Sequence, residues 1–114
     1  EALAAMVGKI FDAGGIIGAV CHGPAALSGV ELSDGTRLVA DRDVTGFTRE
    51  EEVAMSTLEK VPFLVADRML AAGATYRKRS AWQVLVVTDG RLITGQNPGS
   101  AGAVGKAIAE ALAG

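Results

Sequence analysis

The sequence predicts an α/β domain built in layers, with helices packed on a mostly parallel sheet. Three observations support this fold class. Residues 15–20 form a short apolar run typical of a fully buried strand, and apolar residues at helical spacing occupy residues 2–13 before it. Asp89-Gly90, between two apolar runs, is a turn expected of a hairpin. Helices and strands therefore alternate along the chain, which is the pattern of layered α/β folds.

The first third of the chain is expected to hold a helix, a strand and a second helix. Over residues 2–13, the apolar side chains that recur at helical spacing are Leu3, Met6, Val7, Ile10 and Phe11. Gly14-Gly15 ends this helix, and the buried strand covers residues 16–20. Pro24 then begins an apolar stretch, for which we predict a short helix over residues 24–28.

The middle third begins with a turn and short extended pieces. Ser33-Asp34-Gly35-Thr36 has the composition of a turn, and extended segments are expected at residues 37–40 and 44–47. Thr48 and Glu51 fit a capping box, in which each side chain bonds the backbone N–H of the other residue. We therefore predict a helix over residues 49–58.

The last third should contain two more helices and a hairpin. Pro62 suits the first turn of a helix that runs to Ala72 and ends at Gly73. Extended segments are expected at residues 75–77, 84–88 and 91–94. Asn97-Pro98 begins a final helix, whose apolar face carries Val104, Ile108 and Leu112.

Length and composition limit the possible classes of function. A chain of 114 residues is one domain or part of one, and 49% hydrophobic residues can supply a core. The formal net charge of -2 gives no basis for binding nucleic acid or an anionic membrane surface. No apolar run approaches the roughly 18 residues that a membrane span needs. One cysteine excludes an internal disulfide and fits a reducing compartment, so we expect a cytoplasmic protein.

The segment Ala19-Val20-Cys21-His22-Gly23 carries the most information about function. The only cysteine follows the buried strand, and the only histidine comes next. A reactive residue at a sharp strand-to-helix turn with small neighbours is the nucleophile-elbow pattern. Such a turn would place the thiol at a helix N-terminus, where partial positive charge favours thiolate. The alternative is that Cys21 is an inert small hydrophobe, as buried free cysteines usually are. The adjacent histidine and the small neighbours favour the functional interpretation.

Three segments, in this order along the chain, resemble a known superfamily. They are Ala-Val-Cys-His-Gly-Pro-Ala-Ala-Leu at 19–27, Val-Thr-Gly-Phe-Thr-Arg-Glu-Glu-Glu at 44–52 and Leu-Ile-Thr-Gly-Gln-Asn-Pro-Gly-Ser at 92–100. The sequence resembles the ThiJ/PfpI superfamily, with its flavodoxin-like, class I glutamine-amidotransferase-like fold. It is most similar to the branch of heat-shock-type, glutathione-independent glyoxalases and chaperones. The resemblance implies that residues 1–114 are the C-terminal portion of one such domain, with the N-terminal strands missing.

The resemblance implies catalytic roles for three residues. Cys21 matches the family nucleophile, His22 matches the histidine that follows it, and Glu52 matches the acid of a Cys-His-acid triad. A carboxylate bonded to the far imidazole nitrogen would fix the tautomer and the orientation of His22. From the residues alone, Glu50, Glu51 and Glu52 are equally well explained as first-turn acids that complement the helix dipole.

The same resemblance implies that complete members of the family have a further half of the domain before the part that matches residues 1–114. That half supplies the first strands, a glycine-rich loop with a second oxyanion donor, and a glutamate close to the sulfur. We expect the backbone N–H of His22 to supply one donor for an oxyanion. Trp82 matches a family position near the site, although a lone tryptophan is more often part of a core. Asn97-Pro98 is adequately explained as a helix start.

The resemblance implies a cofactor-independent enzyme acting on small 2-oxoaldehydes, with methylglyoxal converted to lactate as the specific hypothesis. Two alternatives stay open: a cysteine amidase or peptidase of the PfpI type, and a stress-related holdase chaperone or redox sensor. One cysteine and one histidine, adjacent in sequence, do not make a tetrahedral metal site, so no metal is expected. The expected partners are a small aldehyde substrate and a second copy of the chain in a homodimer, with no nucleic acid and no membrane.

Overall fold

The computed structural model describes residues 2–113 of this chain. In chain order the elements are α1 (Ala2–Asp12), β1 (Ile17–Val20), the 3₁₀ helix η1 (Gly23–Gly29), β2 (Asp43–Val44), α2 (Arg49–Ala54), α3 (Val65–Ala71), β3 (Thr75–Tyr76), β4 (Val86–Asp89), β5 (Leu92–Gly95), the 3₁₀ helix η2 (Pro98–Ser100) and α4 (Ala101–Ala113).

The strands form two small sheets. In the larger sheet, β5 lies between β1 and β4, parallel to β1 and antiparallel to β4. Val20 is opposite Gly95, so the last residue of β1 lies beside the last residue of β5. β2 and β3 form a separate parallel pair. The predicted α/β class is confirmed, and the larger sheet is mixed because the hairpin turn at Gly90 returns β5 antiparallel to β4.

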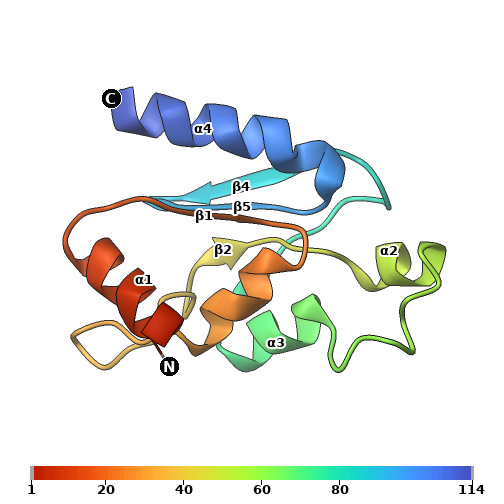
Figure 1. Cartoon of the computed structure of the whole chain (residues 1–114), viewed down its shortest axis with the longest axis horizontal. Coiled ribbons are helices and arrows are strands. Elements are labelled where there is room, and N and C mark those ends of the chain that lie inside the picture. Colours follow the sequence, from red (N-terminus) through yellow and green to blue (C-terminus); the bar gives the residue numbers. More distant parts are fainter. Residues whose placement is uncertain (1, 114) are drawn as a thin grey trace.

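Helices cover both faces of the larger sheet (Figure 1). α4 packs over β1 and β5 on one face, whereas α1 and η1 lie on the other face with α3 beside η1. The main core fills the space between the sheet and this second layer, and its buried members include Phe11, Leu27, Leu38, Met69 and Leu92. Along α4, Val104 is buried but Leu112 is 72% exposed, so only the first part of the predicted apolar face meets the sheet.

Two helices are shorter than the sequence predicts. The helix expected over residues 49–58 ends at Ala54, because Ser56 adopts a left-handed conformation with φ 58°. This conformation cannot continue a right-handed helix. The helix expected from Pro62 begins only at Val65, because the chain bends before it.

Two other short segments also differ from expectation. The helix expected over residues 24–28 is present as the tighter 3₁₀ helix η1, which begins after His22. Residues 38–40 form a turn instead of an extended piece, and only Arg37 pairs, in a single bridge with Glu31.

The strand expected over residues 44–47 is confined to β2. Beyond it, the backbone N–H groups bond elsewhere: that of Thr45 donates to a threonine side chain of β5, and that of Phe47 donates to the carbonyl of Cys21. This segment therefore leaves strand pairing to support the turn that follows β1.

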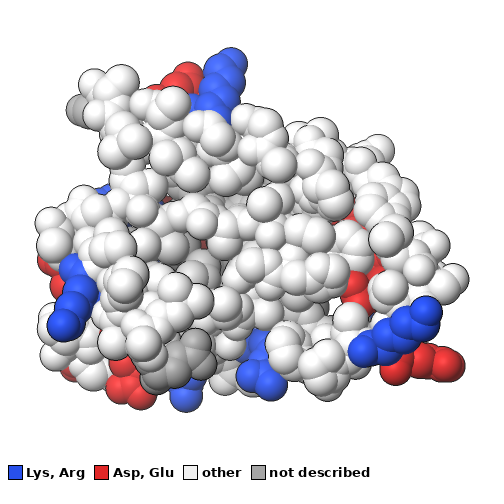
Figure 2. All heavy atoms as spheres, in the orientation of Figure 1, with Lys and Arg blue, Asp and Glu red and all other residues white. Residues whose placement is uncertain are grey.

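The surface carries no large patch of one charge on the face shown in Figure 2. Lys, Arg, Asp and Glu side chains lie mainly at its margins, and the middle is uncharged. On α1, Leu3, Met6 and Ile10 are exposed apolar residues. Within residues 2–113, no helix has both the length and the apolar character that crossing a bilayer requires.

Gly95 lets β5 pack closely against its neighbours. A Cβ at this position would lie 2.6 Å from Val104 Cγ2 and 3.0 Å from Val20 Cγ2. Both atoms belong to packed layers, so we expect Gly95→Ala to lower the free energy of unfolding by about 1–3 kcal/mol. Gly102→Ala is the control, because a Cβ there meets open space in a helix and should leave stability unchanged or slightly raised. Urea denaturation measures both variants, and equal stabilities would contradict this packing.

Candidate active site

Cys21 directly follows β1 and has a left-handed backbone conformation, with φ 64°. Residues other than glycine rarely adopt it, and it costs about 1–3 kcal/mol. The Cys21 N–H donates to the Gly95 carbonyl at 3.0 Å, and the Cys21 carbonyl accepts the Phe47 N–H at 2.8 Å. The sharp turn predicted from the sequence is therefore present, and backbone bonds on both sides hold it.

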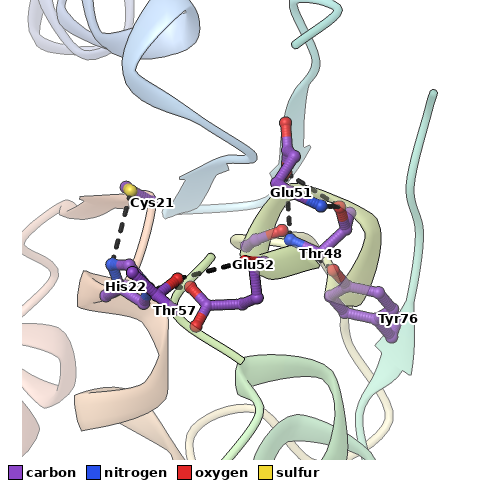
Figure 3. A network of polar contacts seen from close by, with 8 residues as sticks. Cys21, His22, Thr48, Glu51, Glu52, Thr57 and Tyr76 are labelled. Atoms are coloured by element: carbon purple, nitrogen blue, oxygen red, sulfur yellow. Dashed lines mark hydrogen bonds and ion pairs between the residues drawn. The ribbon is translucent and has the colours of Figure 1, made fainter. Parts of the chain in front are cut away.

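The three predicted site residues meet at this turn (Figure 3). Cys21 Sγ lies 3.6 Å from His22 Nδ1, and His22 Nε2 lies 2.5 Å from Glu52 Oε1. The side chain of His22 is 54% exposed, whereas that of Glu52 is 3% exposed. A buried carboxylate therefore anchors a half-exposed imidazole, whose other nitrogen faces the thiol.

α2 positions Glu52 because a capping box builds its first turn. Thr48 Oγ1 accepts the Glu51 N–H at 3.1 Å, and Glu51 Oε1 accepts the Thr48 N–H at 3.0 Å, as predicted. Glu50 stays at the surface, where it pairs with a lysine at 2.5 Å. Glu51 and Glu52 point inward and are buried. The fold thus gives three first-turn glutamates different surroundings, one at the surface and two buried.

Glu52 contacts the imidazole through one oxygen only. Its Oε2 atom is buried and makes no hydrogen bond within residues 2–113. A single hydrogen bond sets the distance to the imidazole but does not by itself fix the rotation of the ring about its Cβ–Cγ bond. The orientation of the His22 ring therefore also depends on what packs against its face.

An aromatic pair supplies this packing. The ring centroid of Phe47 lies 4.5 Å from that of His22, with an interplanar angle of 41°. Phe47 also lies 5.8 Å from Trp82 in an edge-on contact of 66°. Both arrangements are favourable for aromatic rings. Spacing in the sequence gives no sign of this role for Phe47, although it lies in the Gly-Phe-Thr segment.

Glu51, predicted only as a capping residue, is a buried carboxylate with further partners. Its Oε2 atom accepts hydrogen bonds from the backbone N–H of Trp82 at 2.9 Å and from the side-chain N–H of Asn97 at 2.7 Å. Burial by itself raises the pKa of Glu51, but hydrogen bonds from two backbone N–H groups and from Asn97 outweigh it and lower the pKa. Sequence reasoning misses these contacts because Trp82 and Asn97 are 31 and 46 positions away.

The thiol of Cys21 is less acidic than the sequence pattern predicts. Partial burial is the largest cause and raises the pKa of Cys21, and the two buried glutamates add to this rise. A hydrogen bond from the backbone N–H of His22 to the sulfur lowers the pKa of Cys21, but not enough to cancel the rise. The prediction that a helix N-terminus favours thiolate is therefore wrong: η1 is a short 3₁₀ helix that begins beyond His22, and desolvation dominates.

A surface hollow of about 470 Å³ opens beside the imidazole. Its lining consists of Ala4, His22, Ala25, Ala26, Ser28, Gly29, Phe63 and Arg68. Cys21 does not line it, so the hollow borders the histidine and not the sulfur. Within residues 2–113, no group of three His, Cys, Asp or Glu side chains could hold a metal ion. The thiol, the imidazole and the nearby carboxylates suit nucleophilic and acid–base chemistry.

Comparison with known proteins identifies the family. The profile of the DJ-1/PfpI family matches residues 1–111. The chain belongs to the DJ-1/PfpI family. Among curated members, a probable glutathione-independent glyoxalase of Schizosaccharomyces pombe is 37% identical over 109 residues, which are 91% of this chain and 49% of the relative. This result confirms the resemblance carried by the three sequence segments.

Solved structures of similar proteins agree with this DJ-1/PfpI assignment. The 24 kDa rapid encystment protein of Francisella tularensis is 42% identical, with a TM-score of 0.87 over 91% of this chain and 46% of that protein. Glyoxalase III from Candida albicans is 30% identical, with a TM-score of 0.88 over 93% of this chain and 47% of that protein. The chain therefore spans about half the length of the relatives it matches.

The raised pKa of Cys21 leads to a prediction about its reactivity. Thiolate is the reactive form, so alkylation by iodoacetamide should be slow at neutral pH, and its rate should still be rising with pH above the ordinary thiol pKa. Cys21 is the only cysteine, so mass spectrometry of the alkylated chain from about pH 6 to about pH 10 follows it directly. A rate that already reaches its plateau at neutral pH would contradict the raised pKa.

Proposed function

We propose that this chain carries the nucleophilic centre of a glutathione-independent glyoxalase, which converts methylglyoxal to lactate. The continuous contact from Glu52 through His22 to Cys21, on a strained turn, is the observation that supports it. Relatives that are named glyoxalases match most of this chain. Because the chain spans about half of their length, the activity is proposed for the complete gene product. Residues 1–114 are proposed as the C-terminal portion of its single domain.

The reaction begins with addition of the thiol to the aldehyde. Cys21 Sγ forms a bond to the aldehyde carbon while His22 Nδ1 takes the thiol proton, and this proton then goes to the former aldehyde oxygen. The product is a hemithioacetal. Because the pKa of Cys21 is raised, a base next to the sulfur is needed at neutral pH, and His22 Nδ1 is 3.6 Å away.

The hemithioacetal then rearranges without a cofactor. A base removes the proton from the carbon that bears sulfur, and the adjacent ketone carbon is protonated, which gives a thioester of the 2-hydroxy acid. The base is His22 or the glutamate that the resemblance places in the preceding half. Water hydrolyses the thioester, releasing lactate and restoring the thiol. Oxidation of one carbon balances reduction of its neighbour, so no external oxidant or reductant is required.

Glu52 selects the form of His22 that this chemistry needs. Its carboxylate accepts a hydrogen bond from the N–H at Nε2. The proton of the neutral imidazole therefore stays on Nε2, and Nδ1 is unprotonated and able to accept the thiol proton. When His22 carries a proton on both nitrogens, the same carboxylate stabilises the positive charge. Burial of Glu52 keeps competing water from this contact and strengthens it.

Two substitutions test these roles by lactate formation from methylglyoxal without glutathione. Cys21→Ser should abolish turnover, because the hydroxyl is a much weaker nucleophile than the thiol. Glu52→Gln should lower kcat by about a hundredfold or more, because an amide no longer fixes the tautomer of His22. Glu50→Gln is the matched control and should keep parental activity, since Glu50 is exposed and pairs with Lys78 instead of the histidine. Circular dichroism confirms folding, and turnover retained by Cys21→Ser would refute the mechanism.

Other outcomes would point to the alternative functions. Hydrolysis of a chromogenic peptide that depends on Cys21, without lactate formation, would indicate a cysteine amidase or peptidase. Suppression of client aggregation that survives Cys21→Ala, without any turnover, would indicate a holdase chaperone. Both assays use the same preparations as the lactate assay, so the three results are directly comparable.

We propose further that the complete protein is a cytoplasmic homodimer. The exposed apolar residues Leu3, Met6 and Ile10 on α1 support a contact between copies, and the single cysteine fits a reducing compartment. Size-exclusion chromatography with light scattering of the complete protein should give twice the mass of one copy. A single-chain mass at micromolar concentration would contradict the dimer.

A further inference from the structure

We propose that Glu51 is a positioning residue for His22. It acts through the aromatic pair of Trp82 and Phe47, so two adjacent glutamates of α2 restrain one imidazole by different routes. Glu52 holds a ring nitrogen directly, whereas Glu51 holds the aromatic pair against the face of the ring. This inference deepens the proposed function and rests on it for the catalytic role of His22.

The carboxylate of Glu51 joins three distant segments. Oε1 accepts from the backbone and side chain of Thr48, both at 3.0 Å, which builds the first turn of α2. Oε2 accepts from Trp82 in the loop before β4 and from Asn97 before η2. All these partners are donors, so only a group that accepts at both oxygens satisfies them. Glu51 is fully buried, and its carboxylate is held in place by these donors. It therefore anchors the loop before β4 to α2.

The loop needs such an attachment because Trp82 is in a left-handed conformation, with φ 68°. A tryptophan there is disfavoured, and the hydrogen bond from its N–H to Glu51 helps to hold it. The backbone conformation sets the direction of the indole, which meets the Phe47 ring edge-on at 5.8 Å. Without the bond, the loop can relax to an extended conformation that carries the indole away from Phe47.

Phe47 transmits the restraint to the catalytic pair. Its ring lies against the His22 ring, and its backbone N–H bonds the Cys21 carbonyl. The bond to Glu52 alone does not fix the rotation of the imidazole about its Cβ–Cγ bond, and this rotation would move Nδ1 away from the sulfur. The aromatic face contact prevents the rotation, so His22 is held at two points.

The experiment uses two measurements in the full gene product. The first is kcat and KM for methylglyoxal. The second is the pH profile of Cys21 alkylation by iodoacetamide, which needs no turnover. His22→Asn defines the profile of a thiol without its base. In protein that is folded, as judged by circular dichroism, loss of the Glu51 charge alone would move this profile to lower pH, because that charge raises the pKa of Cys21. Loss of positioning would instead make the profile approach that of His22→Asn.

Glu51→Gln is compared with Glu50→Gln, which removes one charge from the same turn of α2 and an exposed ion pair to Lys78, but no contact to Trp82 or Asn97. An amide at position 51 carries N–H donors in place of one carboxylate oxygen. It can no longer accept hydrogen bonds at both positions, so the bonds to Thr48 or those to Trp82 and Asn97 are lost. We expect kcat to fall by about ten- to a hundredfold with KM changed less than about twofold, because a small misplacement of a catalytic group has an effect of this size. The alkylation profile should approach that of His22→Asn, and Glu50→Gln should match the parent.

A second pair of variants tests the aromatic contact of Trp82 while keeping every charge. Trp82→Leu deletes the edge contact to Phe47 but retains the backbone N–H that bonds Glu51, and Trp82→Phe restores an aromatic ring. We expect Trp82→Leu to reproduce the loss of kcat and the altered profile, and Trp82→Phe to recover much of both. This pair decides the question even if Glu51→Gln does not fold.

Folded Trp82→Leu with the parental kcat and alkylation profile would overturn the proposal. Any effect of Glu51→Gln would then come from the lost charge and not from the aromatic pair. Folded Glu51→Gln with parental behaviour would overturn it as well. Failure of the proposed function is a separate result: the parent would form no Cys21-dependent lactate. The alkylation profiles would still decide whether Glu51 positions His22.

Discussion

The left-handed backbone at Cys21 is the constraint on which the candidate site depends. It is maintained by two backbone hydrogen bonds, one to β5 and one from Phe47 in the loop after β2. An extended residue here would prolong β1 and carry His22 away from α2. The stability of the sheet and the geometry of the site are therefore linked, because the carbonyl that holds Cys21 belongs to Gly95, the last residue of β5.

Electrostatics at the site favours a neutral thiol in the resting protein. Two buried carboxylates lie on the same turn of α2, and their charge adds to the desolvation that raises the pKa of Cys21. Both carboxylates are needed elsewhere: Glu52 orients the imidazole and Glu51 joins α2 to two loops. The proposed reaction therefore relies on a base at the moment of attack and not on a preformed thiolate, which makes the orientation of His22 decisive.

The first turn of α2 is where distant segments converge. Its capping box, recognisable as Thr48 and Glu51 in the sequence, is present with the predicted bonds. The additional bonds of Glu51 to Trp82 and Asn97 have no counterpart in local sequence, because they join residues that only the fold brings together. The same holds for Phe47, which leaves strand pairing after β2 and reaches both the Cys21 carbonyl and the His22 ring.

The sequence by itself determined the α/β class, the order of the main elements, the elbow at Cys21 and the capping box of α2. These depend on local periodicity, turn residues and caps, which act over a few positions. Tertiary structure alone decided where α2 ends and where α3 begins, and it gave Glu50, Glu51 and Glu52 their different long-range partners. It also reversed the expected acidity of the thiol. Burial and charge at one point in space depend on residues far apart in the chain, and no local pattern encodes their sum.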